Sequence, residues 1–206
     1  METTLLILFI AFLVFFVIQF DYQSCVYSRI TFVQPKKYTP KNIQVSVLVC
    51  AKNEYENLQK NLPILVAQNY PNYELVLIDD ASSDDTLELF EEYEKQYSFI
   101  KLVKVKNNEA FWGNKKFALT LGIKAAKNEY LLYTDADCCP KSENWISEMT
   151  SHFTKKKTIV LGYGAYEKIA GSFLNKLIRF ETLLSATQMF AWTKFGKPYT
   201  GVGRNM

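Results

Sequence analysis

The sequence predicts an α/β fold, in which a mostly parallel β-sheet is flanked by helices and preceded by one transmembrane helix. Two observations lead to this expectation. Short apolar, β-branched runs alternate with amphipathic segments of helical length, a pattern typical of right-handed strand–helix–strand units. Ahead of them, residues 3–20 carry no charge, and a helix of that length crosses the hydrocarbon core of a bilayer.

Composition supports one sizeable domain. The chain has 206 residues, of which 49% are hydrophobic and 22% charged, and its net charge is +3. These values suit neither a disordered tail nor a nucleic-acid-binding arm, and the charge is too small to hold a polyanion. We therefore expect no nucleic acid among the partners.

The apolar N-terminal segment has two interpretations, a retained anchor and a cleavable signal peptide. A signal peptide needs a basic start and a small-x-small cleavage site. Neither is found before residue 3 or after residue 20, which favours an anchor over residues 1–20. All nearby basic residues follow the span, namely Arg29, Lys36, Lys37 and Lys41. The positive-inside rule then places the rest of the chain in the cytoplasm, at the membrane.

Residues 21–43 are predicted to be a juxtamembrane linker, because they are polar and contain Pro35 and Pro40. Their basic cluster suits a solvated tether or a weak attraction to anionic headgroups. The sheet is expected to begin after Gln44, where the pattern becomes apolar and β-branched.

The elements of the sheet domain follow from periodicity. The predicted strands are 45–50, 73–80, 99–105, 129–134 and 158–166. The first predicted helix carries Leu58, Leu62 and Leu65 on one face, with Pro63 as a potential break. The later ones are 82–97, which opens with Ser and Asp and has acids in its first turn, then 114–126, 143–153 and 172–199.

Cysteine and histidine usage argues against a zinc site. The four cysteines, Cys25, Cys50, Cys138 and Cys139, include no Cys-x-x-Cys pair, and His152 is the only histidine. No spacing typical of zinc ligands results. The cysteines agree with a reducing compartment, and His152 is interpreted as an ordinary surface or helix residue.

Polar segments follow three of the predicted strands. They are "AKNE" (51–54), "DDASSDD" (79–85) and "DADC" (135–138). In parallel α/β sheets, ligands bind beyond the carboxyl ends of the strands. One acidic strand end could be a helix cap, but three that converge on one rim predict a binding site.

Asp135 and Asp137 are separated by a single small residue. Two carboxylates so placed can share a hard cation, and Mg²⁺ or Mn²⁺ fills its remaining positions with water and substrate phosphates. The alternative is that Asp135 caps a turn and Asp137 caps the helix near Trp145. The tripeptide alone does not decide between these interpretations.

Taken together, these segments resemble the family 2 glycosyltransferases, inverting enzymes of the Rossmann-like GT-A fold. The resemblance rests on "VSVLVCAKNE", "QNYPNYELVLIDDASSDDT", "KKFALTLGIKAA", "YLLYTDADCCP" and "TGVGRNM", in the order and spacing of that family. It covers residues 44–206, which are thus expected to form a glycosyltransferase domain. No single segment is decisive, but the ordered set is highly specific.

The resemblance implies roles for individual residues. The nucleotide of a sugar donor would be held by Ala51, Asn53, Glu54 and Asp80, with Asp135 near the ribose and Asp137 on the metal. A lysine near the nucleotide would be Lys115 or Lys116, because "GNKKFAL" has one residue more than the family pattern after Gly113. A solvated helix face is the alternative for both lysines.

The implied reaction moves a sugar, with inversion, from a nucleotide-diphosphate donor to a hydroxyl of a glycan or lipid acceptor, as in cell-envelope synthesis. The metal would neutralise the leaving diphosphate, and a carboxylate base would deprotonate the acceptor. The family's acidic base motif lies downstream of its Gly-Arg-Asn-like segment, and here the sequence stops at Met206. We therefore expect the domain to be incomplete at its C-terminus and the 206-residue chain alone to have little activity.

Three alternatives are weighed against this interpretation. A nucleotidyltransferase is disfavoured because "CAKNEYEN" after the first strand has no glycine-rich phosphate loop. A dinucleotide oxidoreductase is disfavoured because no Gly-x-Gly-x-x-Gly follows that strand. A non-catalytic, membrane-anchored relic that still binds a nucleotide sugar stays open.

Residues 172–199 raise a further question, because they predict a long amphipathic helix. Phe173, Leu177, Leu184 and Met189 are expected on its apolar side. It either packs on the sheet or lies on the membrane surface.

Overall fold

The computed structural model describes residues 2–33, 39, 41–106, 115–154, 156, 158–203 and 205–206. The chain divides into two compact units. The first comprises Met1–Lys36 and Ala165–Gly201, and the second Lys37–Gly164 and Val202–Met206. The predicted basic pair Lys36 and Lys37, the linker prolines, and Gly113 lie outside the described residues.

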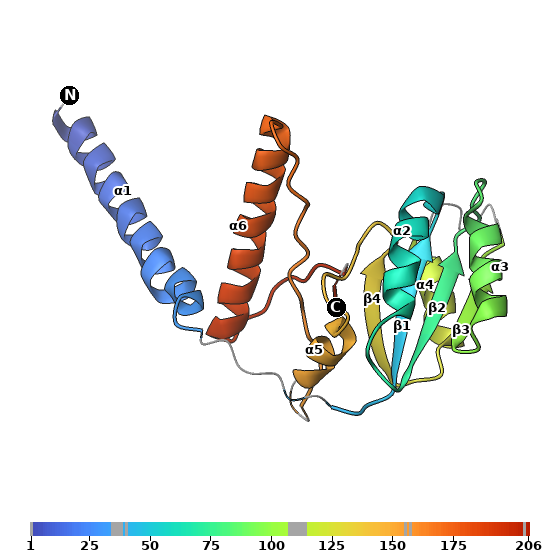
Figure 1. The fold of residues 1–206 in the computed structure, drawn as a ribbon. Helices are drawn as coiled ribbons and strands as arrows, with labels where there is room; N and C mark the ends of the chain where they lie inside the picture. Colours follow the sequence, from blue (N-terminus) through green and yellow to red (C-terminus); the bar gives the residue numbers. More distant parts are fainter. Residues whose placement is uncertain are drawn as a thin grey trace. The chain divides into compact units, whose positions relative to one another are not determined.

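The second unit is built on a four-stranded sheet with the order β3-β2-β1-β4, in which every neighbouring pair is parallel (Figure 1). The strands are β1 (Val45–Ala51), β2 (Tyr73–Asp79), β3 (Ile100–Lys104) and β4 (Tyr130–Asp135). The central strand β1 is buried along its whole length. Its continuous apolar run is typical of a strand covered on both faces, and the predicted parallel α/β sheet is confirmed.

Helices cover both faces of this sheet. They are α2 (Tyr55–Val66), α3 (Thr86–Gln96), α4 (Lys115–Ala125) and α5 (Trp145–Ser151). Apolar side chains of α2, α3 and α5 join one core with alternate residues of the strands, while α4 packs on the opposite face (Figure 1). Because strand residues alternate between faces, Val49 and Ala51 point to the first core and Leu48 and Cys50 to α4.

Pro63 does not divide α2, contrary to the break considered from the sequence. The helix is continuous from Tyr55 to Val66. Pro63 lies in its last turn, where its carbonyl accepts a hydrogen bond from the Ala67 N–H at 3.0 Å. Leu62 and Leu65 on either side of it are buried, so packing on the sheet compensates for the one backbone bond that proline removes.

The predicted fifth strand, 158–166, is wrong. Residues 158–166 form no strand or helix. The edge of β4 is instead occupied by the C-terminal residues, through an antiparallel bridge between Thr134 and Asn205 and a bond from the Tyr133 N–H to the Met206 carbonyl at 2.7 Å. Gly162 donates its N–H to the Asn205 carbonyl at 2.8 Å, so this stretch pairs with the C-terminal residues rather than with the sheet.

The first unit contains α1 (Glu2–Asp21), the short turns η1 (Tyr22–Val26) and η2 (Tyr27–Ile30), and α6 (Phe173–Phe195). Helix α1 exposes apolar side chains along its length and has none buried. In the described part of the chain it is the one helix long and apolar enough to cross a membrane, as predicted, although a signal sequence would pass the same test. The first residues of the predicted linker are helical turns rather than extended chain.

Candidate functional site

The carboxyl ends of β1, β2 and β4 lie level with one another. Ala51 is the register partner of Asp79, and Cys50 that of Asp135. The segments that follow these strands therefore leave the sheet at a common rim, although they are far apart in the sequence. This is the arrangement predicted from the three polar strand ends.

The loops after β1 and β2 are joined by hydrogen bonds. The Asp80 N–H donates to the Ala51 carbonyl at 2.8 Å, and the Asn53 N–H donates to the Ser82 hydroxyl at 3.0 Å. Asn53 and Ala81 both have positive φ, 57° and 52°. Asparagine tolerates this left-handed conformation, whereas alanine rarely adopts it, so the loop after β2 holds local strain of the kind found at functional sites.

Asn53 and Glu54 use part of their hydrogen-bonding capacity within the loops. The Asn53 Oδ1 accepts the Ser83 N–H at 2.7 Å, and the Glu54 carboxylate accepts from Asn57 Nδ2 at 2.7 Å. The Ala51 side chain is buried, with its carbonyl engaged by Asp80. Of the residues predicted to hold a nucleotide, these three shape the rim, and Asp80 projects from it half-exposed.

Asp84 ties the start of α2 to the start of α3. Its carboxylate accepts the Tyr55 N–H at 3.2 Å and the Thr86 N–H at 3.1 Å. Its slight burial acts in the opposite direction, but the hydrogen bonds from Thr86 and Tyr55 hold the pKa of Asp84 below its ordinary value. Asp84 thus holds together the first residues of α2 and α3, the helices that follow the loops after β1 and β2.

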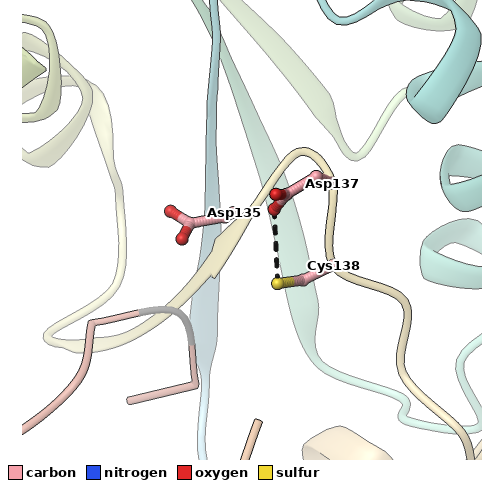
Figure 2. A group of neighbouring side chains, drawn as sticks. All are labelled: Asp135, Asp137 and Cys138. Atoms are coloured by element: carbon pink, nitrogen blue, oxygen red, sulfur yellow. Dashed lines mark hydrogen bonds between the residues drawn. The ribbon is translucent and has the colours of Figure 1, made fainter. Parts of the chain in front are cut away.

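The Asp-Ala-Asp turn after β4 is fixed from beneath. Ala136 is buried in the core, and its carbonyl accepts a hydrogen bond from the buried Asn61 Nδ2 at 2.9 Å. The Cys138 N–H closes the turn on the Asp135 carbonyl at 3.0 Å. Figure 2 shows Asp137 and Cys138 facing each other, while Asp135 extends to the other side of the strand end. A small residue is required between the acids because it points into the core.

The turn offers ligands suited to a cation. One oxygen each of Asp135 and Asp137 and the Cys138 Sγ all lie within 4.8 Å of one another. Carboxylate oxygens are the donors that Mg²⁺ and Mn²⁺ prefer, so these residues fit the metal that the sequence predicted. Lys115 Nζ already pairs with Asp135 Oδ1 at 2.6 Å, which leaves exposed Asp137 as the better-placed ligand.

A cavity of about 430 Å³ lies beside this turn, between the end of the sheet and α4. Its lining includes Cys50, Lys115, Lys116, Thr120, Tyr133 and Asp135. Burial acts against the charged form of Lys115, but the hydrogen bond and charge of Asp135 outweigh it and raise its pKa. Lys115, one of the two lysines left open by the sequence, is thus paired with Asp135.

Acidic groups of the rim act on the thiol of Cys50. Burial first, and then the charge of Asp80, raise the pKa of this thiol to about 11, with Asp135 and Asp79 adding to the effect and Lys115 opposing it. Charges from β2, β4 and α4 thus all act on one thiol at the end of β1. Asn61 was not singled out from the sequence. Cys50 was named there as a cysteine but not as part of the site, although the alternation of β1 could have placed it on the side facing α4.

Comparison with a protein-family model identifies the family of this chain. Residues 46–202 match the model for glycosyl transferase family 2, which is most of the chain. The chain belongs to glycosyl transferase family 2. The resemblance inferred from the sequence is therefore confirmed.

Among curated members of this family, the cholesterol galactosyltransferase of Borreliella burgdorferi is 37% identical over 94 residues, which is 46% of this chain and 25% of that protein. The poly-beta-1,6-N-acetyl-D-glucosamine synthase of Staphylococcus epidermidis is 38% identical over 93 residues, 45% of this chain and 21% of that protein. The matched regions thus span about a quarter or less of these relatives.

Among solved structures, the mannosyltransferase PcManGT from Pyrobaculum calidifontis, determined with GDP-Man and Mn²⁺, superposes with a TM-score of 0.52 at 23% identity. The match covers 61% of this chain and 38% of that one. At this identity the likeness establishes the fold. The four-stranded parallel sheet with its flanking helices is the GT-A-like fold expected of this glycosyl transferase family 2 chain.

Proposed function

We propose that the rim of the sheet is the donor site of a glycosyltransferase that moves a sugar from a nucleotide diphosphate to a hydroxyl of a glycan or lipid acceptor. The observation that carries the proposal is the grouping of Asp80, Asp135 and Lys115 around Cys50, with Asp137 in the adjoining turn. Family membership supplies the reaction class, and the cavity beside the turn supplies room for a ligand.

The nucleotide is proposed to lie over the loops after β1 and β2. The Asp80 carboxylate accepts a hydrogen bond from a ring N–H of a uracil-type or guanine-type base. The backbone at Ala51 borders the base. Asn53 and Glu54 keep the loop in shape through their bonds to Ser83 and Asn57, and Asn53 Nδ2 offers a donor to the nucleotide.

The cation is proposed to bind at Asp137, with Asp135 as a second ligand or as the partner of the ribose. A Mg²⁺ or Mn²⁺ ion held there would supply positive charge to neutralise the departing nucleoside diphosphate. Lys115 holds Asp135 in place through the 2.6 Å ion pair. Its ammonium adds a second positive charge close to the diphosphate.

Transfer with inversion requires the acceptor hydroxyl to attack the anomeric carbon from the face opposite the leaving group, while a carboxylate base removes its proton. No residue is assigned as that base. The expectation that this chain alone turns over little sugar stays a prediction, and a metal-dependent transferase assay of the 206-residue protein tests it.

Helix α1 is proposed to be a retained anchor, with the sheet domain on the cytoplasmic side. Its uncharged, exposed surface suits lipid, and Arg29 and Lys41 follow it, as the positive-inside rule requires of a cytoplasmic domain. The domain boundaries proposed from the sequence, 1–20, 21–43 and 44–206, go with this arrangement. Sugar transfer to cell-envelope glycans or glycolipids would then take place at the membrane.

Calorimetric titration of the full chain in detergent, with UDP-sugars and GDP-sugars and with or without Mn²⁺, tests the donor site. We expect one nucleotide class to bind, more tightly with Mn²⁺. Asp80→Asn should weaken binding about tenfold, because one hydrogen bond to a charged group contributes about 1.5 kcal/mol. Asp137→Asn should abolish the effect of Mn²⁺.

Asp85→Asn is the matched control, because Asp85 is an exposed acid in the same loop whose side chain caps no helix. It should bind the donor like the parent. If Asp80→Asn and Asp85→Asn weaken binding equally, or if no nucleotide sugar binds, the proposed donor site is wrong. Donor binding without any transfer to acceptors, even with added partner segments, would favour the non-catalytic relic.

A further inference from the structure

Helix α6 carries a stripe of exposed apolar side chains along its first three turns. Phe173, Leu177, Phe180 and Leu184 are 72%, 48%, 65% and 45% exposed. Their spacing of four, three and four residues places them on one face of a helix. We call these four residues the α6 stripe.

The opposite face of α6 packs within its own unit. Asn175 is buried, donating to the Glu167 carbonyl at 3.0 Å and accepting the Ile169 N–H at 2.9 Å, and Met189 is buried as well. The expectation that Met189 lies on the apolar side together with Leu184 is wrong, because Met189 is buried and Leu184 is exposed. The α6 stripe is therefore separate from the helix's internal contacts.

The C-terminal end of α6 is fixed against the residues that directly follow α1. The Trp192 and Tyr22 rings lie 5.9 Å apart, and the Arg29 guanidinium lies 4.9 Å from the centre of the Phe195 ring. Gly196, with φ 89°, ends the helix in a left-handed cap. If α1 crosses a bilayer, these contacts hold α6 at the level where α1 leaves it.

The residues at this junction are those that favour the boundary between lipid and water. Tryptophan and tyrosine concentrate at the headgroup level, and arginine and lysine extend their charges into it. Tyr199 adds another ring against Trp192, with centroids 6.3 Å apart. An interfacial helix has an apolar face of large side chains. On α6 this face is the α6 stripe, flanked by the exposed Leu174 and Leu183, which are 66% and 53% exposed.

A membrane-spanning role for α6 is disfavoured by its composition. Lys176 and Glu181 lie beside the α6 stripe, and among the described residues only the segment Glu2–Ile30 has the hydropathy of a span. The apolar side chains of α6 cover too little of the helix for it to cross a membrane. Because α6 is attached next to the apolar helix α1, it suits the surface of the bilayer that α1 crosses.

We propose that α6 lies in the headgroup region of the bilayer that α1 crosses, with the α6 stripe turned into the acyl chains. This inference rests on the proposed anchor. It adds a second membrane contact, one formed by a segment 150 residues further along the chain, so that the membrane holds the protein at two points.

Spin labels on the full chain, reconstituted in vesicles of phosphatidylcholine and phosphatidylglycerol, test this. Cys25, Cys138 and Cys139 are replaced by serine, and Cys50, whose thiol is buried, is retained. A nitroxide is attached at Leu184→Cys in one variant and at Leu177→Cys in a second. Ser185→Cys is the matched control, because it is exposed and lies one residue, about 100° of helix, from Leu184.

We expect oxygen, which concentrates in lipid, to relax the labels at 184 and 177 several-fold more than a water-soluble nickel chelate does, and the reverse at 185. Equal access of the chelate to 184 and 185 would overturn the proposal. So would a label at 184 shielded from both reagents, since a protein partner would then cover the stripe.

A label at Phe12→Cys in α1 separates this inference from the anchor on which it rests. Lipid exposure at 12 with water exposure at 184 and 177 would refute the α6 contact alone. Water exposure at 12 would refute the anchor itself, and the membrane contact of α6 with it.

Discussion

Cys50 has an unusual setting for a thiol at the mouth of a cavity. It is the last but one residue of β1, it is buried, and it faces Asp135 across the sheet register. Burial and the neighbouring acids raise its pKa to about 11. Burial is the larger cause, and the acids that add to it would favour a cation at the proposed donor site.

This setting predicts slow alkylation of Cys50. At pH 8 a thiol of pKa 11 is about one thousandth ionised, and only the thiolate reacts. Between pH 8 and pH 10 its rate should rise about a hundredfold, whereas a thiol with the ordinary pKa near 8.5 gains only about fourfold. Iodoacetamide labelling, followed by peptide mass spectrometry, measures both rates.

The same protein in denaturant is the control, because unfolding removes the burial and should give Cys50 the ordinary pH profile. Asp80→Asn should speed labelling modestly by removing one of the charges. A folded protein whose Cys50 reacts at pH 8 like its unfolded counterpart would contradict the buried, acidic surroundings described for this thiol.

At the scale of elements, α4 packs closely on β2. Gly122 lies in the middle of α4, where a Cβ would come within 2.2 Å of the Ile78 Cδ1 and 2.8 Å of its Cγ1. Ile78 is fully buried, so its side chain would have to repack to admit this Cβ. This contact sets the depth of α4 and therefore the position of Lys115 at its start.

Gly122→Ala should for this reason destabilise the protein. Overpacking a core costs about 1–3 kcal/mol, while replacing a helical glycine by alanine contributes about 1 kcal/mol in the other direction. We expect a net loss of up to about 2 kcal/mol in the free energy of unfolding, measured by urea denaturation.

A double-mutant cycle with Ile78→Val provides the check. Valine lacks the Cδ1 atom that a new Cβ would meet, so Gly122→Ala should cost less in that background. If alanine stabilises the parent protein, as it does in an exposed helix, the packing described for α4 is wrong.

The sequence predicts best those helices and strands whose apolar residues, spaced as the element requires, are also the residues that the fold buries. The apolar run of β1 and the three-residue spacing of Leu87 and Phe90 in α3 correspond to a strand and a helix in the structure. The errors arise from contacts that no local pattern contains. Residues 158–166 have the pattern of a strand, but Asn205, 39 residues after Tyr166, pairs with β4 in their place.

At the scale of the whole molecule, one topological rule brings the candidate site together. Parallel strands place their carboxyl ends on the same rim, which sufficed to predict that the segments after β1, β2 and β4 meet. The contacts between individual side chains of the site could not be predicted without the structure. The ion pair of Lys115 with Asp135 and the support of Ala136 by Asn61 depend on how deeply α4 and α2 pack, and spacing along the chain does not encode that depth.

The central claim is that Asn53, Asp80 and Asp137 border one site that holds a nucleotide sugar and its cation. Paramagnetic broadening by Mn²⁺, in the presence of the nucleotide sugar that binds, measures this directly in the amide NMR spectrum of the labelled protein. We predict that signals of residues 51–54, 80–83 and 135–138 broaden together, and that Asp137→Asn abolishes the effect. Broadening confined to 135–138, or centred on α3 or α5, would contradict the claim.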